Sequence, residues 1–241
     1  MHNLRKKYVL LINFDKYQIN VGAGVLKRTL YFESDHYSMY AEDVVARLRE
    51  LYPGGYFHIN KDPFYLLIST VLSQRTRDDV TIPTSQKLFS VFGTVEEMAQ
   101  ADVDELQELI RNVGFYRVKA QRILDISRII LQDYDGVVPD SMDELLKLPG
   151  VGRKTANCVL GYGFEQDVIA VDTHVHRISN RMGLVETSEP DETEKELEKV
   201  LSKEDWKDIN GLMVLFGQNV CRPVGPKCNE CIMDDICPKI I

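Results

Sequence analysis

The fold is decided by the stretch Leu148-Pro149-Gly150-Val151-Gly152-Arg153-Lys154-Thr155-Ala156. Upstream of it, Ser141 precedes Glu144 by three residues, a capping-box pattern that predicts a short helix ending near Lys147. Downstream of it, apolar residues recur at helical spacing, so a second helix is expected to begin close to Arg153. The stretch therefore predicts a helix, a hairpin and a second helix.

Gly150 and Gly152 flank Val151 in the middle of this hairpin. Glycine lets the backbone adopt conformations closed to other residues, and it removes the side chain that would keep a partner away. We therefore expect the amides from Gly150 to Arg153 to point outward at the positive end of the following helix, where a phosphate oxygen is held favourably. Such a grip on a nucleic-acid backbone is independent of base sequence. By itself, a Gly-x-Gly pattern more often marks an ordinary tight turn.

A second motif, Val-Ile-Ala-Val-Asp-Thr-His-Val-His-Arg over residues 168–177, follows the hairpin. Its Asp172 ends an apolar run and precedes a helical pattern, so we expect this residue to be the N-cap of a helix at the bottom of a pocket. The two motifs, in this order and at this spacing, resemble those of endonuclease III and, more broadly, of the helix-hairpin-helix DNA glycosylase superfamily. The resemblance covers about residues 38–238.

The resemblance implies a chemistry for two residues. Lys154 would attack the anomeric carbon of a damaged nucleotide that has been extruded from the stack, giving a Schiff base and then a strand nick by β-elimination. Asp172 would face the positive charge that develops on the sugar and would accept or relay a proton. The implied enzyme is a bifunctional DNA glycosylase and abasic-site lyase of base excision repair. Its implied partner is double-stranded DNA with an oxidised pyrimidine or an abasic site.

The resemblance also implies which residues contact DNA. The segment from Ser73 to Asp78 is similar to the part of the family that enters the gap left by an extruded base, with Arg75 where endonuclease III has glutamine. The glycine turn at residues 112–116 is similar to the part that carries an apolar wedge, and Phe115 occupies the wedge position. From its sequence context alone, Phe115 could equally be a core residue. The full set of expected contacts is Gln74, Arg75, Phe115, Tyr116, Gly150, Val151, Gly152, Arg153 and His174.

Four of the five cysteines gather near the C-terminal end with the spacing C-x6-C-x2-C-x5-C; they are Cys221, Cys228, Cys231 and Cys237. In a protein that we expect to be intracellular, this crowding indicates a metal site rather than disulfides, and zinc and a four-iron cluster both fit. The spacing matches the iron-sulfur loop of endonuclease III, so the resemblance implies a [4Fe-4S] cluster. We expect its role to be structural, because no partner sequence for hydride or radical chemistry is visible, and electron transfer or redox sensing is the alternative. Cys158 lies in an apolar helical pattern, and we expect it to be buried and inert.

The charge balance is unusual for a protein that holds DNA. The chain carries 29 basic and 37 acidic residues, which gives a formal net charge of −8. A local basic face can coexist with acid elsewhere, and we expect such faces at residues 1–30 and at residues 117–128, which include Lys119. The acidic residues gather at 189–208, a segment that we expect to face solvent away from DNA.

The sequence predicts an all-α protein, because strand-like alternation is scarce beyond residue 35 whereas amphipathic helical patterns are many. We expect Asp62 to cap a strongly apolar helix that begins at Pro63, and Thr94 to begin another helix through a capping box with Glu97. Asp102 with Glu105 has the same pattern. The other main helices are expected at about residues 38–51, 116–133, 191–201 and 206–216.

The resemblance implies two helical domains, with DNA in the cleft between them. A bundle of residues 60–170 would carry the helix-hairpin-helix motif, and residues 36–59 together with 171–241 would form the domain with the cysteine loop. Residues 1–35 lie outside the resemblance, and this extension of unknown role could hold short strands. It is either a basic arm that adds phosphate contacts or, as its apolar content favours, an extension packed on the body of the protein. No apolar run approaches the length of a membrane span. We therefore expect an intracellular protein, in the cytoplasm or nucleoid. We also expect it to be a monomer.

Other functions are alternatives to this interpretation. Adenine-mismatch enzymes of the superfamily use a glutamate where this chain has Ser69, and thymine-mismatch relatives have a tyrosine where it has Lys154, so both are disfavoured. A monofunctional glycosylase for another lesion is a further alternative within the superfamily. A DNA-binding hairpin protein without catalysis is the alternative from a different class, and it would need neither Lys154 nor Asp172.

Overall fold

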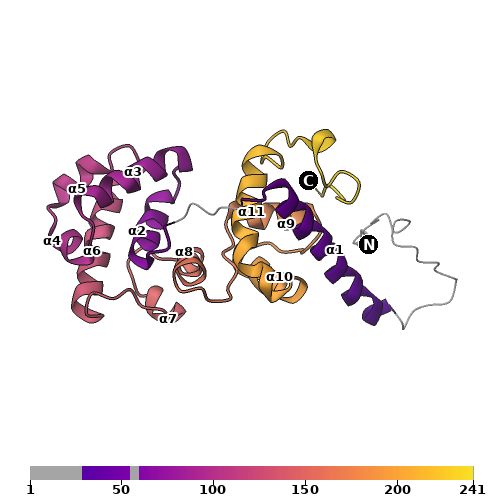
Figure 1. Cartoon of the computed structure of the whole chain (residues 1–241), viewed down its shortest axis with the longest axis horizontal. Helices are drawn as coiled ribbons and strands as arrows, with labels where there is room; N and C mark the ends of the chain where they lie inside the picture. Colours follow the sequence, from indigo (N-terminus) through magenta and orange to yellow (C-terminus); the bar gives the residue numbers. More distant parts are fainter. Residues whose placement is uncertain (1–28, 55–59, 241) are drawn as a thin grey trace, which may run out of the picture. The chain divides into compact units, whose positions relative to one another are not determined.

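The computed structural model describes residues 29–54 and 60–240, and every regular element in these ranges is helical (Figure 1). The predicted all-α class is therefore confirmed for the described part of the chain. Contacts divide the chain into two compact units. We call Phe57–Ala170 the hairpin unit, and Met1–Tyr56 together with Val171–Ile241 the cysteine unit. None of the described helices has the length and apolar character needed to cross a membrane.

The hairpin unit is built around one apolar helix, α2. Its elements are α2 (Pro63–Ser73), α3 (Asp78–Val91), α4 (Val95–Gln100), α5 (Val103–Leu109), α6 (Tyr116–Asp133), α7 (Met142–Leu145), α8 (Arg153–Cys158) and a single π-helical turn, η2 (Val159–Gly163). Helix α2 packs against α3, α6, α8 and η2, and none of its residues is exposed. Its buried residues are Phe64, Leu66, Leu67, Ile68, Val71 and Leu72. A helix that is apolar all round belongs in the centre of a protein, as the sequence indicates for α2.

Helix starts in the hairpin unit follow the predicted local chemistry in three cases. Asp102 caps α5 by accepting hydrogen bonds from the amides of Asp104 and Glu105 at 2.8 and 3.3 Å. Asp62 caps α2 by accepting a hydrogen bond of 2.7 Å from the amide of Tyr65, and Pro63 takes the first helical position. Thr94 and Glu97 form a complete capping box at α4, in which each side chain accepts from the other residue's amide at 3.2 Å. Because caps depend on residues three apart, the sequence is sufficient to locate them.

The predicted capping box at Ser141 is wrong. Ser141 occupies the N-cap position of α7, but its side chain makes no capping hydrogen bond, and the helix ends at Leu145. The carboxylate of Glu144 instead accepts hydrogen bonds of 2.6 Å each from the Tyr134 hydroxyl and the Lys147 ammonium. Tyr134 comes from the end of α6, so a tertiary partner has taken the glutamate that the local pattern needs.

The cysteine unit is organised around α11. Its elements are α1 (Thr29–Leu51), α9 (Thr173–Arg181), α10 (Pro190–Val200), η3 (Lys203–Asp205), α11 (Trp206–Asn219) and η4 (Cys228–Glu230). Helix α11 packs against α1 and α9, and its Phe216 is fully buried. At Gly217 a Cβ atom would collide with the side chains of His174 and Arg177, so glycine is what allows α11 to lie this close to α9.

Helix α1 begins earlier than the sequence predicts. Residues 30–32 belong to the extension that could hold short strands, yet they lie inside α1, and the helix starts nine residues before the predicted position Ser38. Between Thr29 and Leu51 the sequence contains no glycine or proline, so nothing local stops the helix from extending. The predicted arm at residues 1–28 lies outside the described residues.

Replacing Leu72 by alanine should lower the free energy of unfolding by about 2–5 kcal/mol, because this fully buried side chain fills the centre of the hairpin unit. Leu146→Ala is the matched control: that leucine is 41% exposed, and its loss should change the free energy of unfolding by about 0.5 kcal/mol or less. Urea unfolding followed by circular dichroism measures both. Equal effects from the two substitutions would contradict the assigned core.

Candidate functional site

The hairpin joins α7 to α8 through a turn that only glycine can make at residue 150. Gly150 has φ +76°, and a Cβ atom on it would lie 2.8 Å from Cδ of Arg122. Val151 is buried, and its amide donates to the carbonyl of Leu148 at 3.1 Å. The expectation that every amide of this turn points outward is therefore wrong for Val151. Gly152 is exposed and is the N-cap of α8.

Lys154 lies in the first turn of α8 and is half-buried. Behind it, Asn157 is buried and donates to the carbonyl of Ile169 at 2.9 Å, which ties α8 to the segment that precedes Asp172. Cys158 is buried, as predicted. Helix α8 then widens into the π-helical turn η2, a feature that is frequent at functional sites.

Two turns next to the hairpin carry the residues predicted to enter DNA. Gln74 follows α2, and its side-chain amide donates to the carbonyl of Gly150 at 2.9 Å. Arg75 is exposed, and its guanidinium carbon lies 5.7 Å from the ring centroid of Phe115. Phe115 is 63% exposed, so the alternative that it belongs to the core is wrong. The structure thus brings Gln74, Arg75, Phe115 and the hairpin together within one unit.

Tyr116 is the other residue of these two turns that is predicted to contact DNA, and its surroundings differ from those of Gln74, Arg75 and Phe115. It is the first residue of α6, it is half-buried, and it packs against the hydrophobic core. The guanidinium carbon of Arg117 lies over its ring at 5.0 Å. Tyr116 therefore holds the start of α6 in place, and its predicted DNA contact stays a prediction.

Lys119 does not lie on the basic face that the sequence predicts at residues 117–128, because it is only 2% exposed. Its Nζ donates to the carbonyls of Leu72 and Gln74 at 2.8 and 2.6 Å and to Oγ1 of Thr76 at 3.1 Å. Burial, with a smaller contribution from the charge of Arg122, lowers the pKa of Lys119 to about 8. Its spacing from the apolar residues of α6 is the sequence signal that could have revealed its burial.

Asp172 is the N-cap of α9, as predicted. Its Oδ1 accepts hydrogen bonds from the amides of His174 and Val175 at 2.8 and 2.9 Å, so Oδ2 takes no part in the cap. Nη2 of Arg177 lies 3.2 Å from Nδ1 of His174 and donates to the carbonyl of Cys221 at 3.0 Å. Arg177 therefore links the start of α9 to the cysteine loop, a connection that the sequence did not reveal.

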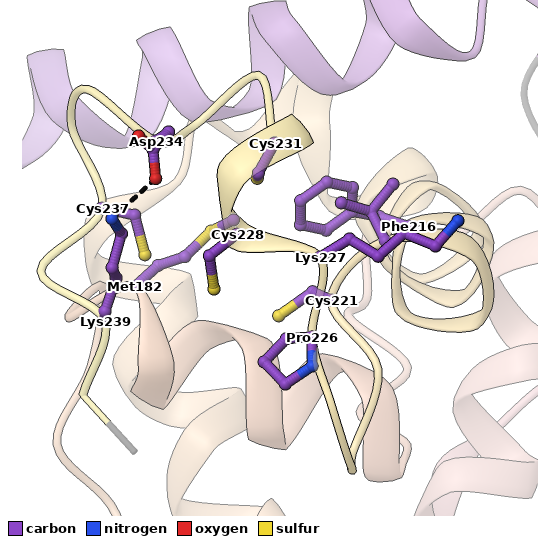
Figure 2. Close-up of a pocket in the computed structure, with 11 residues that line it drawn as sticks. Met182, Phe216, Cys221, Pro226, Lys227, Cys228, Cys231, Asp234, Cys237 and Lys239 are labelled. Carbon is purple, nitrogen blue, oxygen red and sulfur yellow. Dashed lines mark ion pairs between the residues drawn. The ribbon is translucent and has the colours of Figure 1, made fainter.

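The four predicted cysteines line one pocket, shown in Figure 2. Met182, Phe216, Val220 and Pro226 supply much of the apolar wall. The amide of Met233 donates to Sγ of Cys231 at 3.4 Å, and Nη1 of Arg181 lies 3.9 Å from Sγ of Cys221. Within the described residues, no group of three or more Cys, His, Asp or Glu side chains is arranged to hold a metal ion.

Burial raises the pKa of two of the cysteine thiols in this pocket. It raises the pKa of the Cys231 thiol, and it raises the pKa of the Cys237 thiol to about 11. A buried thiolate without a cation is unfavourable, so these thiols keep their protons near neutral pH unless a metal takes the protons' place. Four thiols around an apolar pocket, with amide and guanidinium donors near the sulfurs, have the donor chemistry that metal-sulfur centres use.

A family model of the HhH-GPD superfamily of base excision DNA repair proteins matches residues 68–203, more than half of the chain. The endonuclease III of Thermotoga maritima is 56% identical over 196 residues, which cover 81% of this chain and 91% of that protein. The chain belongs to the endonuclease III family, within the HhH-GPD superfamily. The endonuclease III of Bacillus subtilis is 38% identical over 180 residues, which cover 74% of the present chain and 82% of the Bacillus protein.

Solved structures have the same fold as this endonuclease III family member. A trapped covalent intermediate of endonuclease III with DNA is 35% identical, with a TM-score of 0.77 over 83% of this chain and 95% of that one. A non-covalent endonuclease III–DNA complex is 34% identical, with a TM-score of 0.78 over 83% and 94%. A thermostable thymine-DNA glycosylase, 23% identical with a TM-score of 0.73, shows the likeness of fold alone.

The cap at Asp172 can be tested separately from any chemistry. Asp172→Ala removes the acceptor for the amides of His174 and Val175, which should lower the free energy of unfolding by about 1 kcal/mol. Asp172→Asn keeps a side-chain carbonyl oxygen, so it should cost only about a few tenths of a kcal/mol. Thermal unfolding of the two variants measures the difference. An equal loss in both would show that Oδ1 does not cap α9.

Proposed function

We propose that this protein is a bifunctional DNA glycosylase and abasic-site lyase that removes oxidised pyrimidines from double-stranded DNA. The observation that carries the proposal is the combination of Lys154, placed in the first turn after the glycine hairpin, with Asp172, fixed as the cap of α9. These residues lie in a chain that is 56% identical to an endonuclease III. Its action on chromosomal DNA also leads us to locate the protein in the cytoplasm or nucleoid.

The hairpin unit would hold and open the duplex. The turn at Gly150 and Gly152 brings its backbone close to a phosphate, because Gly152 is exposed and a Cβ atom on it would meet nothing within 4 Å. The exposed ring of Phe115 would insert between base steps, and Arg75 would occupy the space left by the extruded nucleotide. His174 and Arg153 would add contacts to the backbone.

Lys154 would act as the nucleophile. As a neutral amine, its Nζ attacks the anomeric carbon of the extruded nucleotide, the bond from that carbon to the base breaks, and the base leaves with a proton. The amine then gives up one proton, and the ring oxygen takes up a proton as its bond to the anomeric carbon breaks. The product is a protonated Schiff base between Lys154 and the opened sugar. Removal of a proton from the adjacent sugar carbon then expels the 3′ phosphate and nicks the strand.

Asp172 would stabilise the charge that this reaction develops. As the bond to the base breaks, positive charge builds up on the sugar, and a carboxylate held in a fixed orientation lowers the energy of that state. The two amide hydrogen bonds to Oδ1 supply the fixed orientation, while Oδ2 takes no part in the cap. The same carboxylate can accept a proton and return it in a later step.

Two observations disfavour the alternative functions. An adenine-mismatch enzyme would need a glutamate at residue 69, where the hydroxyl of Ser69 instead donates to the carbonyl of Leu66 at 3.2 Å. A passive DNA-binding protein needs no lysine at residue 154, and a family member without the nucleophile would be monofunctional. The likeness to a thymine-DNA glycosylase carries no weight here, because it concerns the fold alone.

We also propose that the four cysteines hold a [4Fe-4S] cluster. Cys221, Cys228, Cys231 and Cys237 line one pocket, and burial keeps at least two of these thiols from ionising without a cation. When bound, the cluster would supply structural cross-links between the loop and the helices of the cysteine unit. Arg181 already supports this loop, because it donates to the carbonyls of Arg222 and Pro223 at 2.6 and 3.0 Å.

Borohydride trapping on a duplex with one oxidised pyrimidine tests the proposed chemistry. The wild-type protein should give a covalent protein–DNA product, and Lys154→Ala should give none, because borohydride reduces only a Schiff base that the lysine has formed. The affinity of Lys154→Ala for DNA should stay within about threefold, since the substitution loses at most one phosphate contact. Lys147→Ala, which removes an exposed lysine that lies two residues after the end of α7, is the control and should trap normally.

Each outcome of this experiment decides between functions. Base release without trapping in the wild type would mean a monofunctional glycosylase. Trapping that survives in Lys154→Ala would refute the assigned nucleophile. If the wild-type protein neither releases the base nor is trapped on the DNA, the proposed function is contradicted.

The cluster makes a separate prediction. Purified protein should be yellow-brown, with absorbance near roughly 400 nm and about four irons per chain. Cys231→Ser should lose the colour, because that thiol lines the pocket, whereas Cys158→Ala should keep it, because Cys158 is buried in α8 and does not line the pocket. Metal analysis by mass spectrometry measures the content. A colourless protein with stoichiometric zinc would refute the cluster.

A further inference from the structure

We propose that Lys119 is a positioning residue that locks the turn carrying Arg75 to the turn carrying Phe115, so that both side chains enter DNA as one rigid element. The inference rests on the proposed function, because it concerns how the duplex is read. Lys119 itself is buried and touches no DNA in this proposal. It acts through the backbone of the two turns.

The contacts of Lys119 all go to the end of α2 and the turn that follows it. Leu72 contributes one of the last carbonyls of the helix, Gln74 contributes the carbonyl next to Arg75, and Thr76 contributes its hydroxyl oxygen. The last carbonyls of a helix have no partner within the helix, and a cation there is favourable. Lysine is almost never fully buried unless it is paired. Lys119 is therefore a strong constraint on where residues 72–76 lie.

The second turn is attached to the same group of atoms. The amide of Gly114 donates to Oγ1 of Thr76 at 3.2 Å, and this hydroxyl also accepts from Lys119. A Cβ atom on Gly114 would lie 3.2 Å from the carbonyl oxygen of Arg75, so the two turns are in close contact. Lys119 also belongs to the first turn of α6, which begins directly after Phe115. One ammonium group thus fixes both turns.

Both side chains that project from these turns stand on a strained backbone. Arg75 has φ 54° and Phe115 has φ 58°, in the left-handed region that residues with a Cβ atom rarely adopt. Such conformations persist only when the surroundings hold them, and they are common where a side chain must be aimed at a ligand. The guanidinium of Arg75 lies over the ring of Phe115, so the two side chains project from the protein surface as a stacked pair.

The hairpin is connected to this assembly as well. The side-chain amide of Gln74 donates to the carbonyl of Gly150, while the carbonyl of Gln74 accepts from Lys119. Near neutral pH the ammonium form of Lys119 predominates, since the pKa of about 8 lies above that pH. This form has three donors for its three oxygen acceptors. The charged state is thus the one that holds the turns.

Under this proposal, Lys119 affects DNA affinity and discrimination among the opposite bases, but it does not affect the chemical reaction at Lys154. Loss of Lys119 should release the two turns, so that Arg75 and Phe115 must be ordered when DNA binds, which weakens binding. It should also reduce discrimination among the bases opposite the lesion, because Arg75 is the side chain that would face that base. The trapping reaction at saturating protein should proceed, because Lys154 lies on a different helix, α8.

The test measures the dissociation constant for duplexes that carry a tetrahydrofuran abasic analogue opposite each of the four bases. Lys119→Met keeps the length and the apolar stem of the side chain and removes the ammonium. It should raise the dissociation constant by about tenfold or more. It should also reduce the differences in dissociation constant among the duplexes with the four opposite bases. In an Arg75→Ala, Phe115→Ala background, the same substitution should change affinity by less than about twofold, because a group that acts through these two side chains has nothing left to position.

Three further variants make the result decisive. Thr76→Val removes the hydroxyl shared by Lys119 and Gly114 at low risk to folding, and it should weaken binding in the same direction. Lys87→Met removes an exposed lysine of α3 and controls for lost charge. Ile130→Ala destabilises the same helix α6 about 16 Å from Lys119, from a rise of 1.5 Å per residue, and controls for lost stability.

Each comparison has an outcome that overturns one idea and not the other. Unchanged affinity in both Lys119→Met and Thr76→Val, or full additivity with the Arg75 and Phe115 substitutions, would overturn the positioning role. In either case, a wild-type protein that binds the analogue and traps on damaged DNA would leave the proposed function intact. A wild-type protein that does neither would overturn both.

Discussion

The ammonium of Lys119 at the C-terminal end of α2 is the interaction on which the rest of the hairpin unit depends. Burying a charge is costly unless hydrogen bonds compensate it, and the three oxygen acceptors around this group do so. The same bonds satisfy carbonyls that a helix end leaves without partners. The same hydrogen bonds thus compensate the buried charge and satisfy the carbonyls at the end of α2. As a consequence, the turns carrying Arg75 and Phe115 cannot move independently. Leu72 contributes both to this site, through its carbonyl, and to the core, through its buried side chain.

Features that depend on neighbouring residues could be predicted from the sequence. Asp62, Thr94 and Asp172 each cap a helix through hydrogen bonds to amides two or three residues away, so the pattern contains the whole interaction. The apolar character of α2 likewise predicts its central place. The four cysteines were found because their spacing is itself the signal, and the structure places all four around one pocket. Their proposed cluster comes from the resemblance and the donor chemistry.

Features that depend on distant partners could not be predicted in this way. The Ser141 pattern fails because Tyr134 and Lys147 take the carboxylate of Glu144. The spacing of Lys119 on α6 is compatible with burial, but its hydrogen-bond partners could not be predicted, because the carbonyls that surround it come from a segment more than forty residues earlier in the chain. In the cysteine unit, Arg177 joins the start of α9 to the cysteine loop through His174 and Cys221, again across a long sequence separation. In each case a tertiary hydrogen bond decided the outcome.

The identity of residue 75 bears on what the proposed enzyme would read. A glutamine side chain both donates and accepts hydrogen bonds, whereas an arginine only donates. On the proposed function, Arg75 therefore favours an unpaired base that offers acceptor atoms, and it gains nothing from the amino groups of adenine or cytosine. Its stacking on Phe115 restricts the directions in which those donors can point. Selectivity for the opposite base would then arise from two sources, the donor-only chemistry of arginine and the rigid turn on which Lys119 holds it. A flexible arginine would retain the first source and lose the second.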